Sequence, residues 1–189
     1  MADQLYLTYT LRNYSEENML RYYEKLLKLF PFSRLAKNPS TFKVIPVDIT
    51  EPAVLEIPMS APVEIDQVLA AAKDFANPDS CYRLETWWDL WQFDADWKLT
   101  PSRAALVCFG PEFEREDESH LEIEFGIDAH FLPQPDIPGS LVTIQSNIKS
   151  LLKMVHDLDD ALPVETRRLW SESGENFSEK LQQALQAAG

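Results

Sequence analysis

His120-Leu-Glu-Ile-Glu-Phe-Gly-Ile-Asp-Ala-His-Phe131 alternates apolar and polar side chains along its whole length. Successive side chains of a β-strand point to opposite faces, so the apolar residues share one face and the charged residues share the other. This pattern is typical of an antiparallel strand that covers a core on one side and meets water on the other. Gly126 falls on the charged face and marks a possible β-bulge.

Other strand-like segments lie on both sides of this stretch. They are residues 5–11, 42–49, 54–57, 81–93 and 104–109. The last is apolar on both faces, which predicts a central strand covered on both sides. Pro46 indicates that its own segment is an edge strand or contains a bulge. The sequence therefore predicts about six strands, with breaks in the later ones at 94–96 and 112–118.

Helical spacing of apolar residues predicts three main helices. They cover about 15–30, 64–75 and 144–158, and each is bounded by capping or proline signals. In the tail we expect a short helical piece near Trp170 and a terminal helix from about Ser178.

The order of these elements predicts an α+β fold, in which three main helices pack mostly on one face of a mixed or antiparallel sheet. We expect a single domain over residues 1–189. Within it, residues 1–76 form a strand-helix-strand-strand-helix half, 81–132 an antiparallel strand meander, and 141–189 the C-terminal helices.

Composition limits the cellular context. No segment approaches the roughly 20 consecutive apolar residues of a membrane-spanning helix, and the first residues lack the basic and apolar regions of a signal peptide. The two cysteines, Cys81 and Cys108, lie in strand-like segments, which favours two reduced, buried thiols over a disulfide framework. We therefore expect a cytoplasmic protein.

The charge is strongly negative and unevenly distributed. The formal net charge is −14 at pH 7. The first 43 residues contain seven basic and four acidic residues, so they carry +3 and the remainder −17. A chain of this charge is repelled by nucleic acids and by anionic lipids. The asymmetry suits a basic protein partner, or the basic end of a second copy.

The common local signatures of enzymes are absent from the sequence. The five glycines are too far apart for a dinucleotide fingerprint or a phosphate-binding loop. The sequence also lacks HExxH, CxxC, EF-hand and Gly-x-Ser-x-Gly motifs. We expect no cofactor and no metal on these grounds, although an active site built from dispersed residues stays possible.

Asp128 and His130, with Glu124 across a bulge, are the candidate catalytic or metal-ligating residues. A carboxylate beside an imidazole can orient it as a general base or a metal ligand. His120 would lie roughly 33 Å from His130 along a straight strand and cannot join them. The favoured interpretation is nevertheless that the charged face of residues 120–131 is an ordinary strand surface in contact with water.

Five aromatic residues between Trp87 and Trp97 form a second candidate site. On a strand, Trp87, Asp89 and Trp91 share one face, while Trp88 points to the other. Most such aromatic side chains belong to a core. Because tryptophan occurs on both faces, one face is a candidate ligand-binding or interface surface, with Trp87, Trp91, Asp89 and Trp97 as its residues.

Two functional hypotheses follow. The first is a non-catalytic interaction protein that binds a protein partner or its own copy, for example an acidic inhibitor or immunity-type protein. The alternative is an enzyme or a small-molecule or metal-binding domain, with a Trp-lined pocket that uses Asp128 and His130.

Overall fold

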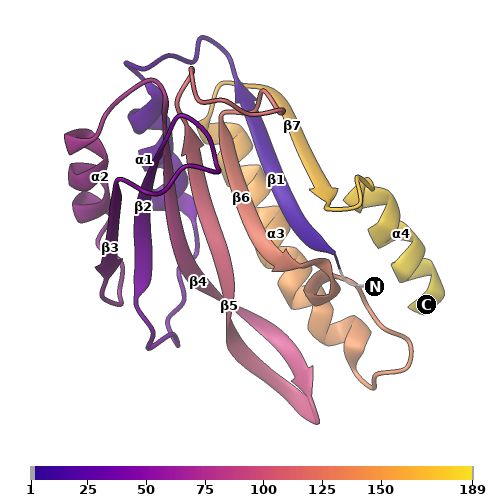
Figure 1. Ribbon diagram of the computed structural model, residues 1–189. Helices are drawn as coiled ribbons and strands as arrows, with labels where there is room; N and C mark the ends of the chain where they lie inside the picture. The colour runs from indigo at the N-terminus through magenta and orange to yellow at the C-terminus, as the bar shows by residue number, and fades with distance from the viewer. Residues whose placement is uncertain (1–2, 189) are drawn as a thin grey trace.

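The computed structural model describes residues 3–188, and a seven-stranded sheet forms its centre (Figure 1). The strands are β1 (Gln4–Leu11), β2 (Ser40–Pro46), β3 (Leu55–Met59), β4 (Ser80–Asp94), β5 (Asp96–Phe109), β6 (Leu121–Ile127) and β7 (Val164–Ser171). Their order across the sheet is β3-β2-β4-β5-β6-β1-β7, and every neighbouring pair is antiparallel. The expected α+β class is confirmed, with an antiparallel sheet of seven strands where about six were predicted.

Helices cover only one face of this sheet. They are α1 (Met19–Leu29), α2 (Ile65–Asp74), α3 (Ser140–Ala161) and α4 (Phe177–Ala188), with a short 3₁₀ helix, η1, at Asp128–Phe131. In Figure 1 α1 and α3 lie behind the sheet, α2 lies beside α1 at the left, and α4 lies beside β7 at the opposite edge. Among the described residues, no helix covers the face turned toward the viewer, which we call the open face.

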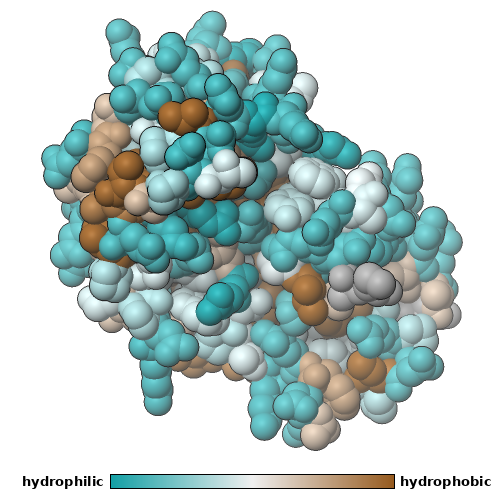
Figure 2. All heavy atoms as spheres, viewed as in Figure 1, coloured by the Kyte–Doolittle hydropathy of each residue, from teal (hydrophilic) through white to brown (hydrophobic). Residues whose placement is uncertain are grey.

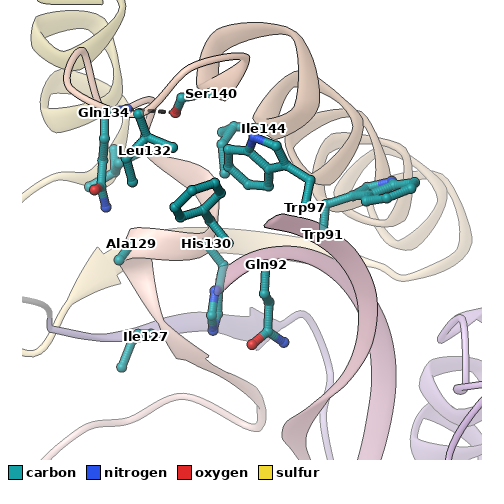
Figure 3. A pocket seen from close by; sticks show the side chains of 12 residues that line it. Trp91, Gln92, Trp97, Ile127, Ala129, His130, Leu132, Gln134, Ser140 and Ile144 are labelled. Carbon is teal, nitrogen blue, oxygen red and sulfur yellow. Dashed lines mark hydrogen bonds between the residues drawn. The ribbon is translucent and has the colours of Figure 1, made fainter. Parts of the chain in front are cut away.

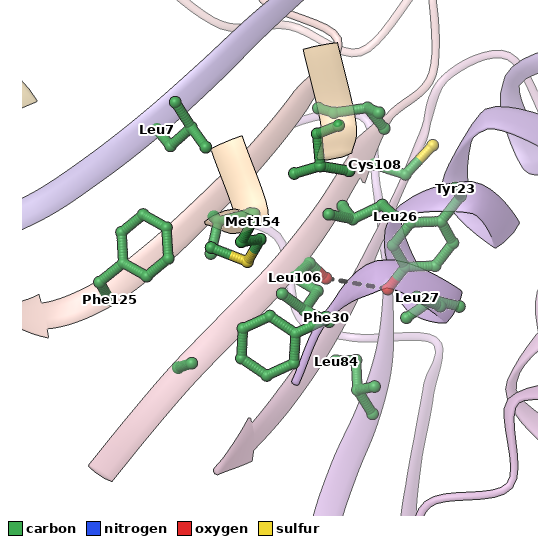
Figure 4. Close-up of a cluster of buried hydrophobic side chains, with 14 of the residues drawn as sticks. Leu7, Tyr23, Leu26, Leu27, Phe30, Leu84, Leu106, Cys108, Phe125 and Met154 are labelled. Carbon is green, nitrogen blue, oxygen red and sulfur yellow. Dashed lines mark hydrogen bonds between the residues drawn. The ribbon is translucent and has the colours of Figure 1, made fainter. Parts of the chain in front are cut away.

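The main core lies between the sheet and α1, α2 and α3. Alternate residues of the central strands enter it, and Trp88 is its largest fully buried side chain. The Tyr23 hydroxyl donates a hydrogen bond of 2.8 Å to the Leu106 carbonyl, which satisfies a buried polar group within this cluster (Figure 4). Burial of the alternating positions explains why the strand and helix periodicities were readable in the sequence.

The C-terminal part corrects one prediction. Residues 164–171 form β7, where a helical piece near Trp170 and an all-helical segment 141–189 were expected. β7 pairs with β1 from Val164 to Ser171 and forms one edge of the sheet. Its residues from Glu165 to Arg168 are exposed. They therefore lack the apolar alternation that identifies a half-buried strand.

The strand predicted over residues 120–131 is also shorter than expected. β6 ends at Ile127, and the next four residues turn into η1. The register against β1 shifts between Gln4↔Ile127 and Tyr6↔Glu124, so β6 carries an extra residue there. Gly126 adopts a φ of +80° in this bulge, a conformation that glycine adopts without steric cost. The bulge and the turn redirect the side chains beyond Gly126.

The two cysteines lie on adjacent strands but on opposite faces of the sheet. Both thiols are free and buried, Cys81 under the loops of the open face and Cys108 in the main core. Burial raises the pKa of Cys108 to about 12, which leaves it protonated and unreactive at neutral pH.

Within residues 3–188, no helix has the length and apolar character needed to cross a membrane.

Candidate functional site

The structure does not bring Asp128, His130 and Glu124 together. Asp128 is 1% exposed and belongs to an ion pair with Lys180 of α4, at 2.6 Å. Glu124 lies on the open face and accepts two hydrogen bonds from Arg83, of 2.6 and 3.0 Å. His130 instead lines a cavity below the sheet edge. Because of the bulge at Gly126 and the turn into η1, the side chains of Glu124, Asp128 and His130 point in three different directions. They therefore do not form an acid–base group.

The four predicted aromatic-segment residues also occupy different places. The carboxylate of Asp89 accepts hydrogen bonds from the Ser33 hydroxyl and from the Arg34 amide, so it anchors the chain after α1. Trp97 donates its indole N–H to the Pro138 carbonyl at 2.9 Å. Trp91 and Trp97 line the same cavity as His130. Trp87 lies apart from them on the open face.

Strand register determines which side chains meet on the open face. One row across the sheet runs through Glu85, Ala105, Glu124, Tyr6 and Trp170, which are successive cross-strand partners. At the middle of the face lies a hollow of about 400 Å³. The small residues Ala105 and Gly126 leave this space open, while larger side chains surround it.

Arginine–aromatic stacks flank the hollow on two sides. Arg103 lies over the Trp87 ring, 5.3 Å from its centroid. On the other side Tyr6 stacks on Trp170 at 4.7 Å, and Arg168 lies over the same indole at 4.9 Å. Among the described residues, no carboxylate lies within 4.0 Å of the Arg103 or Arg168 guanidinium. These two cations can therefore bond an incoming group.

Three carboxylates of the open face, those of Glu85, Glu122 and Glu124, are paired with cations of the same face, whereas Glu172 at the edge of the hollow has no ion pair among the described residues. Glu85 accepts from Lys43 at 2.6 Å, and Glu122 lies 3.4 Å from Arg115. Burial raises the pKa of Glu122 to about 7, although Arg115 opposes the shift. In the space-filling view, hydrophilic and intermediate residues occupy most of this face, and hydrophobic residues form only small patches (Figure 2).

Two loops cover one end of the open face and give it an acidic border. Residues 47–54 and 110–119 meet through an isolated bridge between Asp48 and Glu114. Phe113 of the second loop packs on a small apolar cluster with Val107 and Phe109. Together the two loops contain seven acidic residues and one arginine. The acidic run over 112–118 thus stands beside the uncovered sheet surface.

Searches for similar proteins gave no family. Neither protein-family models nor curated proteins nor solved structures matched the chain significantly.

Most residues around the hollow were missed by sequence reasoning. Tyr6 could have been found, because the alternation of residues 5–11 places it opposite the apolar face of that strand. Arg103 could not, because it meets Trp87 only through the register of β4 and β5. Trp170 was noted in the sequence but assigned to a helix.

Among residues 3–188, no cluster of three or more His, Cys, Asp or Glu side chains could hold a metal ion.

Proposed function

We propose that this chain is a non-catalytic interaction protein that binds a basic protein partner with the open face of its sheet. The observation that carries the proposal is the hollow between the arginine–aromatic stacks, on a sheet face that no described helix covers. Tryptophan, tyrosine and arginine are the residues that dominate binding energy at protein interfaces. The stacked rings hold their arginines in place, which lowers the entropy lost on binding.

Charge complementarity supports a partner that is basic where it meets the two loops and carries hydrogen-bond acceptors where it meets Arg103 and Arg168. The two acidic loops border the open face, and within the face Glu85, Glu122 and Glu124 are already paired with cations. A basic surface docked here would meet negative potential at the border, which accelerates association and excludes acidic proteins. An acidic inhibitor of a basic enzyme is the concrete form of this proposal. The buried free thiols of Cys81 and Cys108 support a cytoplasmic setting for it.

The proposal is tested with a photo-crosslinking amino acid at position 105 on the floor of the hollow. A crosslinked protein is then produced separately and titrated against purified variants by calorimetry. We expect a partner with a basic isoelectric point, and at least about tenfold weaker binding after Arg103→Ala or Trp87→Ala. Arg21→Ala is the matched control, because Arg21 also lies over an aromatic ring, that of Tyr22, but on α1.

The other outcomes reject the proposal in distinct ways. Equal affinity of all three variants would place the contact elsewhere on the molecule. If position 105 crosslinks only to a second copy, and sedimentation shows a dimer that Arg103→Ala dissociates, the occupant is the chain itself and no basic partner is needed. The acid–base alternative lacks a common site, because Asp128, His130 and Glu124 face three directions.

A further inference from the structure

A second cavity, of about 230 Å³, lies between the outer part of the β4–β5 hairpin, η1 and the start of α3 (Figure 3). It shares no lining residue with the hollow of the open face. The indole of Trp97 lies beside Ile144 on one side, and His130 and Gln92 lie next to each other on another. This cavity is therefore a separate site, and an inference about it goes beyond the proposed function.

Hydrogen bonds fix the three walls of the cavity to one another. Asn147 of α3 is 2% exposed; its side chain accepts from the Trp91 amide and donates to the carbonyls of Trp91 and His130, at 2.8 to 2.9 Å. Trp97 fixes the hairpin to the segment before α3 through the Pro138 carbonyl. Gly139 begins α3 with a φ of +76°, a conformation that glycine adopts without steric cost. The cavity is preformed rather than dependent on loop closure.

The lining excludes charged ligands. None of the twelve lining residues is Asp, Glu, Lys or Arg, in a chain in which 25% of residues are charged. The apolar walls come from Phe93, Trp97, Ile144 and their neighbours, and the two aromatic rings meet edge to face with centroids 5.3 Å apart. An ion placed there would lose its hydration without gaining an opposite charge. Aromatic walls instead favour a flat apolar ring.

Three polar side chains of the lining have hydrogen-bonding capacity to spare. The amides of Gln92 and Gln134 and the imidazole of His130 form no side-chain hydrogen bond with any other residue of the described chain. Burial lowers the pKa of His130, which favours the neutral ring with one donor and one acceptor. Such groups recognise the edge of an uncharged ring that carries both N–H donors and acceptors.

We propose that this cavity binds a neutral, planar heteroaromatic molecule of one or two fused rings. The ring would lie against Phe93 and Trp97, with its polar edge toward Gln92, Gln134 and His130. A volume of about 230 Å³ is below the usual range for drug-sized ligands, and so suits a molecule of this size. Free indole and the free nucleobases share this chemistry, and they differ in the number of hydrogen-bonding groups on the edge.

The test titrates the full chain with indole, uracil and adenine, followed by tryptophan fluorescence and calorimetry. We expect at least one probe to bind with a dissociation constant between roughly 10 µM and 1 mM, as small rings do in preformed pockets. Ala129→Leu places a larger side chain in the lining and should weaken binding at least about tenfold. Ala76→Leu, at an exposed position after α2, is the matched control and should leave the affinity unchanged.

Amide variants distinguish the two sources of the ring. Gln92→Ala and Gln134→Ala should weaken nucleobase binding about five- to tenfold each, and should leave indole, with its single N–H, within about twofold. If indole binds and the bases do not, the site is an indole-type site. The reverse result assigns it to nucleobases.

Two results would overturn the proposal. One is the absence of binding by all three probes up to about 5 mM, at which even weak ring ligands are detected. The other is binding without nuclear Overhauser contacts between probe protons and the methyl groups of Ile144 and Leu132, which would locate the ring elsewhere. This second measurement uses the unmodified chain, so it holds even if Ala129→Leu fails to fold.

Discussion

Glu122 carries the clearest electrostatic conflict on the open face. Its side chain is buried, and burial favours the neutral acid, whereas Arg115 at 3.4 Å favours the carboxylate. Burial has the larger influence, so the pKa rises from 4.5 to about 7. The Arg115–Glu122 pair is therefore incomplete at neutral pH, and it holds the acidic loop 110–119 less firmly than its geometry implies.

We expect Glu122 to lower the stability of the fold as the pH rises. Its pKa is higher in the folded chain than in the unfolded chain, so the folded state binds the proton more tightly. The free energy of unfolding attributable to this group therefore falls between about pH 4.5 and pH 7, and changes little above that. Glu122→Gln should match the unmodified chain near pH 4.5 and exceed it by about 1–3 kcal/mol at pH 8. Denaturant unfolding at both pH values measures the difference.

Glu56→Gln provides the control for this measurement. Glu56 is exposed and lies 3.9 Å from Lys43, so its removal should change stability by less than about 0.5 kcal/mol at either pH. If Glu122→Gln destabilised the chain at pH 8, the ion pair with Arg115 would outweigh burial. The direction of the inferred shift would then be wrong.

At the scale of elements, burial decided what could be predicted from the sequence. The β4 segment and the helix α1 place apolar residues at regular intervals because one side of each enters the core. β7 lies at the edge of the sheet with most of its length exposed, so hydrogen bonding to β1 defines it and no hydrophobic pattern does. The end of β6 was missed because the bulge at Gly126 changes the face of every residue after it.

A buried ion pair attaches α4 to the rest of the fold. Lys180 binds Asp128 at 2.6 Å, and Asp128 also accepts from the Asp3 amide at 3.1 Å and the Ser171 hydroxyl at 3.3 Å. Removal of the cation would leave a buried carboxylate without a counter-charge, which is strongly unfavourable. Phe177, which packs against Phe131, is the other main anchor of this helix.

We expect Lys180→Met to lower the free energy of unfolding by about 2–4 kcal/mol, and to increase hydrogen exchange in α4. Lys153→Met is the matched control, because Lys153 pairs with Asp157 at the same 2.6 Å but on the exposed side of α3. Lys153→Met should lower the free energy of unfolding by less than about 0.5 kcal/mol. Similar small effects of both substitutions would show that the packing of Phe177, and not the ion pair, holds α4.

For the whole molecule, the candidate site was harder to predict than the fold. The periodicity of single segments assigned Trp87 to a possible interface face, and it correctly separated this residue from Trp88. The hollow, however, is assembled from β1, β4, β5, β6 and the segment after β7. Its residues meet only through strand order and register, which non-local pairing determines. The cavity beside α3 likewise joins three elements that no local pattern connects.

The position of each strand in the sheet should also determine how stable it is. β4 and β5 lie at the centre of the sheet. Each pairs with a strand on both sides, and helices cover one face. β3 pairs only with β2, and Pro58 cannot donate a hydrogen bond to the ladder. The outer part of the β4–β5 hairpin, around Ala95, extends beyond the rest of the sheet (Figure 1).

We therefore expect amide hydrogen exchange to follow this order. The amides of Leu84 and Leu106 should exchange only through global unfolding. The free energy of opening derived from their exchange should therefore equal the free energy of unfolding measured with denaturant. Those of Leu55 to Ile57 and of the hairpin near Ala95 should exchange through local opening, about 100-fold or more faster, because few buried contacts oppose their separation. Native-state exchange followed by NMR at increasing denaturant distinguishes the two classes, since only global unfolding depends strongly on denaturant. Protection of β3 equal to that of β5 would show that the sheet opens as one unit, and that the edge strand is held by contacts with α2 rather than by β2 alone.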